Sequence, residues 1–264
     1  MSIHATAIIK DGAIIGDNVS IGAFTIIDSN VTVGDNTVIG SHTFISGHTT
    51  IGENNTIYSH AVLGTDPQDL KYNGEKTYLI IGNNNTIREH TLINTGTAGG
   101  GFKTIIGDKN LIMGHVHMGH DCIIGNNIVI ANSTVLAGHV QIANNAVIGG
   151  ISAIHQFCKV GEFAMLGGGS IVVQDIPPYC ICEGNRASLR GLNINGLRRN
   201  FENREDINEI KKAYKKIFES GNPLAQSANE LLESSKNKYV KLLSQFVLDT
   251  KRGIPFTRKN KNEK

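Results

Sequence analysis

The chain of 264 residues carries Ile, Val, Leu or Met at every sixth position over most of its first 172 residues. This series begins at Ile3 and continues without a gap to Leu63. It resumes at Ile81, shifts by one residue after a loop, and continues from Ile106 to Val172. Neither the period of a helix nor the alternation of a strand produces a period of six, so the pattern indicates a repeat architecture.

Each six-residue unit has the features of a hexapeptide repeat. The residue after the aliphatic one is usually small, and a small or β-branched residue follows four places later, as between Ile15 and Ser20. Three units would form one triangular coil, with aliphatic side chains pointing inward and Gly, Asn or Asp at the corners, where a left-handed backbone costs little. The sequence therefore predicts a left-handed parallel β-helix over residues 1–186.

Two interruptions of the pattern predict loops that leave the β-helix. They cover residues 66–79 and residues 95–105. The second begins with a glycine-rich run that is similar to a phosphate-binding loop, but Phe102 interrupts the motif and no helix follows it. We therefore expect a mobile loop beside a neighbouring subunit, because loops on a rigid scaffold often carry function.

After about residue 186 a helical pattern replaces the six-residue period. Apolar side chains between Ile207 and Phe218 fall on one face of a predicted helix, and lysines surround its other flanks. Two further helices are expected over residues 224–232 and 239–248. Residues 187–264 are therefore predicted to form a small helical domain.

Charge distinguishes the two parts of the chain. Residues 1–189 contain 8 basic and 14 acidic side chains, a net charge of −6, whereas residues 190–264 contain 17 basic and 9 acidic ones, a net charge of +8. The basic part is either a solvated surface or a dock for a nucleic acid, an anionic membrane or an acidic carrier protein. The charged tail beyond Pro255 is expected to fray.

Two observations bear on location. No apolar run is long enough to span a bilayer, and the N-terminus lacks the basic and hydrophobic regions of a secretory signal. The four cysteines have neither a disulfide framework nor the spacing of a metal site. We therefore expect a protein of the reducing cytoplasm with no integral membrane segment.

A group of histidines provides the candidate chemistry. His120, His139 and His155 are separated by 19 and 16 residues, close to the 18 residues of one coil, so we expect them to stack on one edge. An imidazole beside Asp121 suits general-base catalysis, because it titrates near neutral pH. Three stacked imidazoles also suit a zinc site, as in hexapeptide-repeat carbonic anhydrases. Corner histidines without such neighbours are expected to be only solvated, and His42 and His60 are two examples.

Several longer motifs resemble one enzyme family. They are residues 68–72, 119–122, 136–140, 155–157, 177–179 and 191–199. Together they resemble the acyl-ACP:UDP-N-acetylglucosamine O-acyltransferases of lipid A biosynthesis, over nearly the whole chain. The resemblance implies transfer of an (R)-3-hydroxyacyl group from acyl carrier protein to the 3-position of UDP-N-acetylglucosamine. It also implies a cytoplasmic homotrimer with active sites between adjacent β-helices, no metal or other cofactor, and no nucleic-acid partner.

The resemblance also implies roles for individual residues. His120 would be the general base that deprotonates the sugar 3-hydroxyl, Asp121 would orient His120, and the backbone N–H of Gly138 would stabilise the oxyanion. The residues expected to line the substrate sites are Asp69, Lys71, His117, His139, His155, Gln156, Gly168, Asn193 and Arg199. Gly168 matches the position that forms the floor of the acyl groove.

Three departures from the family pattern concern the acceptor. Asn94-Thr95-Gly96 replaces a frequent His-Arg-Gly, Asn195 replaces a frequent Glu, and Asn200 follows Arg199 in place of a second Arg. The acceptor could therefore instead be the 3-amino analogue of the nucleotide sugar, which would give an amide. Two further functions are compatible with the same fold: a zinc-dependent, carbonic-anhydrase-like hydratase and a non-enzymatic β-helix.

Overall fold

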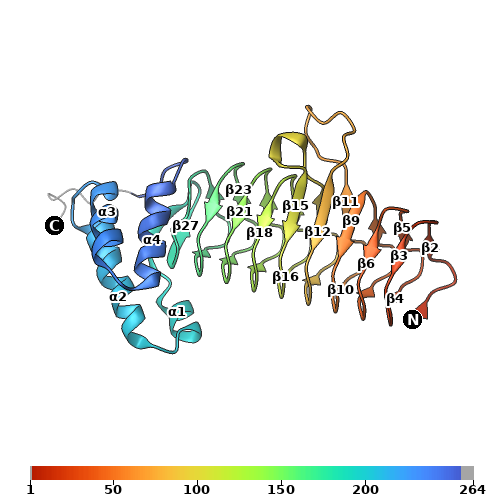
Figure 1. Cartoon of the computed structure of the whole chain (residues 1–264), viewed down its shortest axis with the longest axis horizontal. Coiled ribbons are helices and arrows are strands. Elements are labelled where there is room, and N and C mark those ends of the chain that lie inside the picture. Colours follow the sequence, from red (N-terminus) through yellow and green to blue (C-terminus); the bar gives the residue numbers. More distant parts are fainter. Residues whose placement is uncertain (1, 257–264) are drawn as a thin grey trace.

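The computed structural model describes residues 2–256 and consists of a left-handed parallel β-helix followed by a helical domain (Figure 1). Short strands form three sheets, which are the three sides of a prism. Up to β26, successive strands pass from sheet 1 to sheet 2 to sheet 3 and then back to sheet 1, and the last two strands, β27 and β28, both belong to sheet 1. The predicted fold class is confirmed.

The strands are grouped by sheet. Sheet 1 contains β1 (Ser2–Ile3), β4 (Ser20–Ile21), β7 (Val38–Ile39), β10 (Thr56–Ile57), β13 (Thr86–Ile87), β16 (Leu111–Ile112), β19 (Val129–Ile130), β22 (Val147–Ile148), β25 (Met165–Leu166), β27 (Cys180–Glu183) and β28 (Ser188–Leu192). Sheet 2 contains β2 (Ile8–Ile9), β5 (Ile26–Ile27), β8 (Phe44–Ile45), β11 (Val62–Thr65), β14 (Leu92–Asn94), β17 (His117–Met118), β20 (Val135–Leu136), β23 (Ala153–Ile154) and β26 (Ile171–Val172). Sheet 3 contains β3 (Ile14–Ile15), β6 (Thr32–Val33), β9 (His48–Ile51), β12 (Tyr78–Ile81), β15 (Lys103–Ile106), β18 (Ile123–Ile124), β21 (Gln141–Ile142) and β24 (Lys159–Val160).

The aliphatic residue of each hexad points into the prism. From Ile21 onward these side chains are at most 2% exposed, and burial of one such side chain contributes about 1.5–3 kcal/mol. Ile3, in the first described coil, is 40% exposed. Ile57 pairs with Ile87 across the first interruption, so the inserted residues leave the prism without breaking its stacking.

Each corner of the prism is named by the sheets that it joins: 1–2, 2–3 and 3–1. Many corners place a non-glycine residue in the left-handed region, as at Asn18, Asn36 and Asn54 of corner 3–1. The backbone penalty for this conformation is small for Asn. These turns keep each coil triangular, so residues one coil apart lie above one another.

Both predicted loops leave the prism at corner 2–3 (Figure 1). Residues 66–77 join β11 to β12, and residues 95–102, which include the short 3-10 helix η1 (Ala98–Gly100), join β14 to β15. The loops contact each other, since the hydroxyl groups of Thr77 and Thr95 are 2.8 Å apart.

The last part of the chain forms a helical domain at the C-terminal end of the prism (Figure 1). Its elements are α1 (Ile194–Asn200), α2 (Arg204–Tyr214), the π-helix η2 (Lys215–Glu219), α3 (Leu224–Ser234) and α4 (Lys238–Asp249). The apolar face predicted between Ile207 and Phe218 is buried against α4, for example at Leu243. The tail that was expected to fray lies, from residue 257, outside the described residues.

The helical domain is held to the prism by its final segment. The Thr250 hydroxyl donates to Asp175 Oδ2 at 2.6 Å, and the Asp175 N–H donates to the carbonyl of Gly253 at 2.8 Å. Between residues 2 and 256 no helix has the length and apolar character needed to cross a membrane.

Candidate active site

Corner 2–3 brings several of the predicted site residues together, but not as a stack of three imidazoles. His120 occupies the second position of its corner, His139 the third and His155 the first. The His139 ring meets His120 edge-on at 5.0 Å and stacks on Phe157 at 4.3 Å, whereas His155 is exposed with Nδ1 3.2 Å from the carbonyl oxygen of Gln156, which is also exposed. The expected stack is therefore wrong in detail, because the spacings of 19 and 16 residues shift each histidine by one corner position or more.

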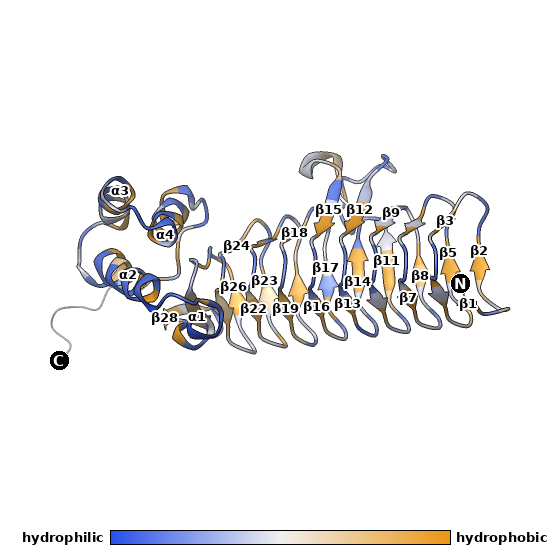
Figure 2. Ribbon diagram, turned by 60° about the horizontal axis from the view of Figure 1, so that its bottom comes forward, coloured by the Kyte–Doolittle hydropathy of each residue, from blue (hydrophilic) through white to orange (hydrophobic). Residues whose placement is uncertain are grey.

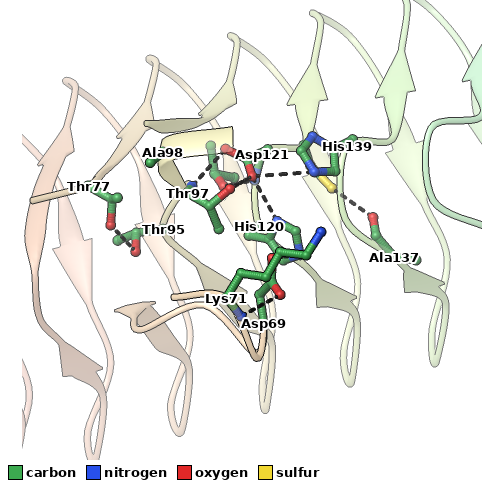
Figure 3. Close-up of polar contacts among 12 residues, drawn as sticks. Asp69, Lys71, Thr77, Thr95, Thr97, Ala98, His120, Asp121, Ala137 and His139 are labelled. Atoms are coloured by element: carbon green, nitrogen blue, oxygen red, sulfur yellow. Dashed lines mark hydrogen bonds and ion pairs between the residues drawn. The ribbon is translucent and has the colours of Figure 1, made fainter. Parts of the chain in front are cut away.

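Asp121 lies at the centre of this corner and is only 3% exposed (Figure 3). Its Oδ1 accepts the backbone N–H of Thr97 at 2.8 Å, and its Oδ2 accepts the Thr97 hydroxyl at 2.6 Å. The same Oδ2 lies 2.7 Å from His120 Nδ1. Because an ionised carboxylate only accepts hydrogen bonds, Nδ1 must carry the proton. Nε2 of a neutral His120 therefore has a free lone pair.

Gly138 lies against the His120 ring. A Cβ added at residue 138 would be 2.6 Å from both Nε2 and Cε1 of His120, so only glycine fits without movement. Among the described residues the Gly138 N–H donates no hydrogen bond. A proton acceptor and an available backbone donor are therefore adjacent, as the assignment of base and oxyanion donor requires.

The loop of residues 66–77 covers the other side of His120 (Figure 3). Asp69 Oδ2 is 3.9 Å from His120 Nε2, and Asp69 Oδ1 accepts the backbone N–H of Lys71 at 3.0 Å. The Lys71 side chain is exposed. Backbone N–H groups, including that of Ala98, lower the pKa of Glu75, so this carboxylate joins the two loops while charged.

Burial sets the protonation of two neighbouring histidines. Desolvation lowers the pKa of His139, against the opposing attraction of Asp121. Desolvation also lowers the pKa of His117, which projects outward from β17. Both imidazoles are therefore mainly neutral at pH 7, and His117 Nδ1 is buried with no hydrogen-bond partner among residues 2–256.

Three predicted residues lie away from His120 within one chain. Gly168 is at corner 1–2, where an added Cβ would meet only Gly150, its carbonyl oxygen at 3.3 Å. Asn193 is 7% exposed and caps α1: its Oδ1 accepts the Gly196 N–H at 3.0 Å and its Nδ2 donates to the Phe163 carbonyl at 3.0 Å. Arg199 is exposed on α1.

One group in the described part of the chain has the composition of a metal site. Ligand atoms of His120, Asp121 and His139 lie within 4.8 Å of one another. This group is not the three-histidine site considered from the sequence, because His155 is not part of it. A metal bound through His120 Nδ1 and Asp121 Oδ2 would replace the 2.7 Å contact between these atoms.

Family models match the two parts of the chain. Residues 12–47, 30–65 and 103–138 match the model described as bacterial transferase hexapeptide. Residues 175–255 match the model described as UDP-N-acetylglucosamine O-acyltransferase, domain 2.

Named relatives are similar along the whole length. The acyl-[acyl-carrier-protein]–UDP-N-acetylglucosamine O-acyltransferase of Aliarcobacter butzleri is 63% identical, over 98% of this chain and 99% of the relative. That of Sulfurovum sp. is 56% identical over the same shares. This chain belongs to the acyl-[acyl-carrier-protein]–UDP-N-acetylglucosamine O-acyltransferase family.

Solved structures of this acyltransferase family have the same fold. The UDP-N-acetylglucosamine acyltransferase from Campylobacter jejuni is 44% identical with a TM-score of 0.93, and covers 97% of this chain and all of that one. The enzyme from Francisella novicida is 35% identical with a TM-score of 0.93, over 98% of this chain and 95% of that one.

The sequence patterns did not identify Thr97 as part of this site. Thr97 lies in the glycine-rich run for which only a mobile loop was expected, and its contacts with Asp121 join residues 24 positions apart. No periodicity or motif relates those positions, because one belongs to an inserted loop. Its spacing from Asp121 thus carries no signal of the contact.

Proposed function

We propose that this chain is an O-acyltransferase that moves an (R)-3-hydroxyacyl group from acyl carrier protein to the 3-position of UDP-N-acetylglucosamine, in the first step of lipid A biosynthesis, in the cytoplasm. The observation that carries the proposal is the full-length similarity to enzymes named for this activity. The geometry supports it, because His120 Nδ1 faces Asp121 while Nε2 lies beside Gly138, whose N–H donates no hydrogen bond among the described residues.

The residues support a simple acyl transfer. His120 Nε2 takes the proton of the sugar 3-hydroxyl while the oxygen of that hydroxyl attacks the thioester carbonyl carbon. The Gly138 N–H stabilises the oxyanion of the tetrahedral intermediate, and Asp121 stabilises the imidazolium through Nδ1–H. Collapse of the intermediate expels the thiolate of the carrier, which receives the proton from His120. No metal or cofactor is needed for these steps.

The apolar character of sheet 2 supports the proposal of a homotrimer. Eight of its nine outward residues are apolar and His117 is the exception, as Figure 2 shows by the hydrophilic colour of β17 among hydrophobic strands. Ile8, Val135 and Ile171 on this face are 40–55% exposed. Copies of the chain would bury this apolar face around a threefold axis.

The trimer would also complete the site. Corners 1–2 and 2–3 border sheet 2, so in a closed ring corner 2–3 of one copy meets corner 1–2 of the next. Gly168 of a neighbour would then form the floor of the acyl groove near His120, and Asn193 and Arg199 of the helical domain would approach the nucleotide. Gly168→Met should shift the preference toward shorter acyl donors, because its side chain would project into the groove, and an added Cβ contacts only Gly150, at 3.3 Å. Unchanged chain selectivity would place the groove elsewhere.

One incubation tests the reaction itself. Purified protein is supplied with carrier protein loaded with 3-hydroxyacyl chains of several lengths, and with UDP-N-acetylglucosamine or its 3-amino analogue. We expect an alkali-labile ester on UDP-N-acetylglucosamine, detected by mass spectrometry. Acylation of the 3-amino analogue alone would change the acceptor, and no acyl transfer to either sugar would refute the proposal.

The 3-amino acceptor remains the second candidate because of Asn94. Its side chain is 1% exposed, and its Nδ2 is bound to Thr65 Oγ1 at 3.0 Å and to the Asp66 carbonyl at 2.9 Å. A histidine at this position in relatives would present a ring to the site that this chain lacks. The acceptor comparison above therefore decides between ester and amide.

A further inference from the structure

We propose that Thr97 is a positioning residue for the acyl transfer: its hydroxyl and its backbone N–H fix the plane of the Asp121 carboxylate, so that Oδ2 faces His120 Nδ1. The inference deepens the proposed function and rests on it. It assigns a task to the loop of residues 95–102 that lies outside the triangular coils.

Two hydrogen bonds connect Thr97 to Asp121. One residue, Thr97, bonds both carboxylate oxygens of Asp121, at 2.8 Å through the N–H and at 2.6 Å through the hydroxyl. Rotation of an aspartate carboxylate about χ2 is otherwise soft, so such a pair of bonds decides its plane. Thr97 is 5% exposed and Asp121 3%, so water does not compete for these bonds.

The loop that carries Thr97 is itself held in place. The backbone N–H of Gly96 donates to the Tyr78 carbonyl at 3.2 Å, and the N–H of Ala98 donates to Glu75 Oε1 at 3.2 Å. Gly100 lies directly against the Asp121 carboxylate, where an added Cβ would overlap it. The Thr97 hydroxyl therefore reaches Asp121 from a fixed backbone (Figure 3).

The hydroxyl shares Oδ2 with His120 Nδ1–H, and this sharing has a chemical consequence. Without the hydroxyl, the carboxylate is freer to rotate, and its charge is less satisfied by neutral donors. The base is then less well oriented, and an imidazolium on His120 is more strongly stabilised. The other titratable groups that face His120 are Asp69 from the loop of residues 66–77 and His139 from the next coil.

The test compares three single variants with the full-length wild type. Thr97→Val keeps the shape and the backbone N–H but removes the hydroxyl, and Thr97→Ser restores the hydroxyl. Thr77→Val is the matched control, because Thr77 is also buried and its hydroxyl bonds within the same pair of loops, at Thr95, away from Asp121. The readouts are kcat, the KM for UDP-N-acetylglucosamine and the pH profile of kcat/KM.

We expect Thr97→Val to lower kcat about 10-fold to 100-fold with little change in the nucleotide KM, since a small misplacement of a catalytic group has effects of this size. The acid limb of the kcat/KM profile should move to higher pH. Thr97→Ser should recover most of kcat, and Thr77→Val should remain within about threefold of wild type. A Thr97→Val enzyme with wild-type kcat and pH profile refutes the inference, as does an equal loss in Thr97→Ser.

A readout without substrate separates this inference from the proposed function. The pH dependence of His120 carbethoxylation by diethylpyrocarbonate, followed by mass spectrometry, reports on the imidazole alone. We expect the profile of Thr97→Val to shift to higher pH and that of Thr77→Val to match wild type. If the profiles of Thr97→Val and wild type superimpose, the role of Thr97 is refuted even in an active enzyme. If the profile shifts but the protein transfers no acyl group, only the proposed function is refuted.

Discussion

Two edges of the prism use the same backbone turn and the same residue type, yet only one forms a candidate catalytic centre. At corner 1–2, the side-chain rings of five residues form a stack in which neighbouring ring centroids lie 4.8–5.1 Å apart. The backbone of each residue is in the left-handed region; the five are Phe24, His42, His60, His90 and His115. All five side chains are exposed. In the described structure the four imidazoles of this ladder make no side-chain hydrogen bond or ion pair.

At corner 2–3 a carboxylate takes a position that a ring would occupy in the ladder of corner 1–2. Asp121 takes the left-handed position that histidines occupy in the other ladder, and His120 approaches it from the preceding position. Two loops inserted at this corner bury the pair. Stacking alone therefore makes a solvated ladder, whereas a buried acceptor beside an imidazole sets its tautomer and gives it a chemical task.

The largest difference between the edges should be catalytic. His120→Ala should lower kcat about 10²-fold to 10⁴-fold, the usual contribution of a general base, whereas the ladder variant His60→Ala should leave kcat unchanged. Steady-state kinetics with acyl carrier protein and UDP-N-acetylglucosamine measure both. A His120→Ala enzyme that keeps more than about a tenth of wild-type activity would contradict the role of His120 as general base.

Replacing the glycine that precedes the left-handed residue should lower activity more at corner 2–3 than at corner 1–2. Gly138→Ala places a Cβ 2.6 Å from His120 Nε2, so we expect a loss in kcat/KM of about 10-fold to 100-fold from displacement of the ring. Gly114 holds the equivalent position below His115, where a Cβ would meet its nearest atoms at 3.3 Å. Gly114→Ala is the control for added bulk at a corner that borders the proposed subunit contact, and its loss of kcat/KM should be clearly smaller than that of Gly138→Ala. Equal activity of the two variants would contradict the assigned geometry.

A smaller effect, on the KM for the acyl donor, should come from the difference in charge between the acidic prism and the basic helical domain. If the carrier protein docks on that domain, added salt should raise the KM for the acyl donor severalfold more than the KM for the nucleotide sugar, because screening weakens long-range attraction. Lys212 pairs with Glu209 and Lys216 pairs with Glu230, so Lys211 and Lys215 are the better positions for reversal to Glu. If the KM for the acyl donor responds neither to salt nor to these reversals, the basic surface is only solvated and does not bind the carrier protein.

The smallest expected effect is on stability in acid. Burial lowers the pKa of His139 below its usual value of 6.5, so below pH 6.5 the unfolded chain binds a proton that the folded chain resists. The free energy of unfolding should therefore fall as the pH decreases from 6.5 through the lower folded-state pKa. His139→Gln should flatten this part of the curve, measured by urea unfolding between pH 5 and pH 8. An unchanged slope would mean that His139 remains solvated.

The sequence alone determined the prism and most of its contents. A six-residue period can be satisfied only if every sixth side chain enters one narrow core, so the hexads from Ile21 to Val172 predicted which residues are buried. The helical period between Ile207 and Phe218 predicted the buried face of the second part in the same way. His120 and Asp121 are adjacent in sequence, and this adjacency was enough to propose their pairing.

Only the tertiary structure decided which neighbours complete the site. Whether a corner histidine joins a ladder or a carboxylate depends on a shift of one position in the turn, as His139 and His155 show. Thr97 reaches the Asp121 carboxylate from an inserted loop, where the repeat no longer relates sequence distance to spatial distance. Asp69 reaches His120 from the other inserted loop, and only the family resemblance, not the period, had placed it in the site. The physical reason is that a periodic core fixes residues that share its period, whereas loop residues are placed by individual long-range hydrogen bonds that the period does not specify.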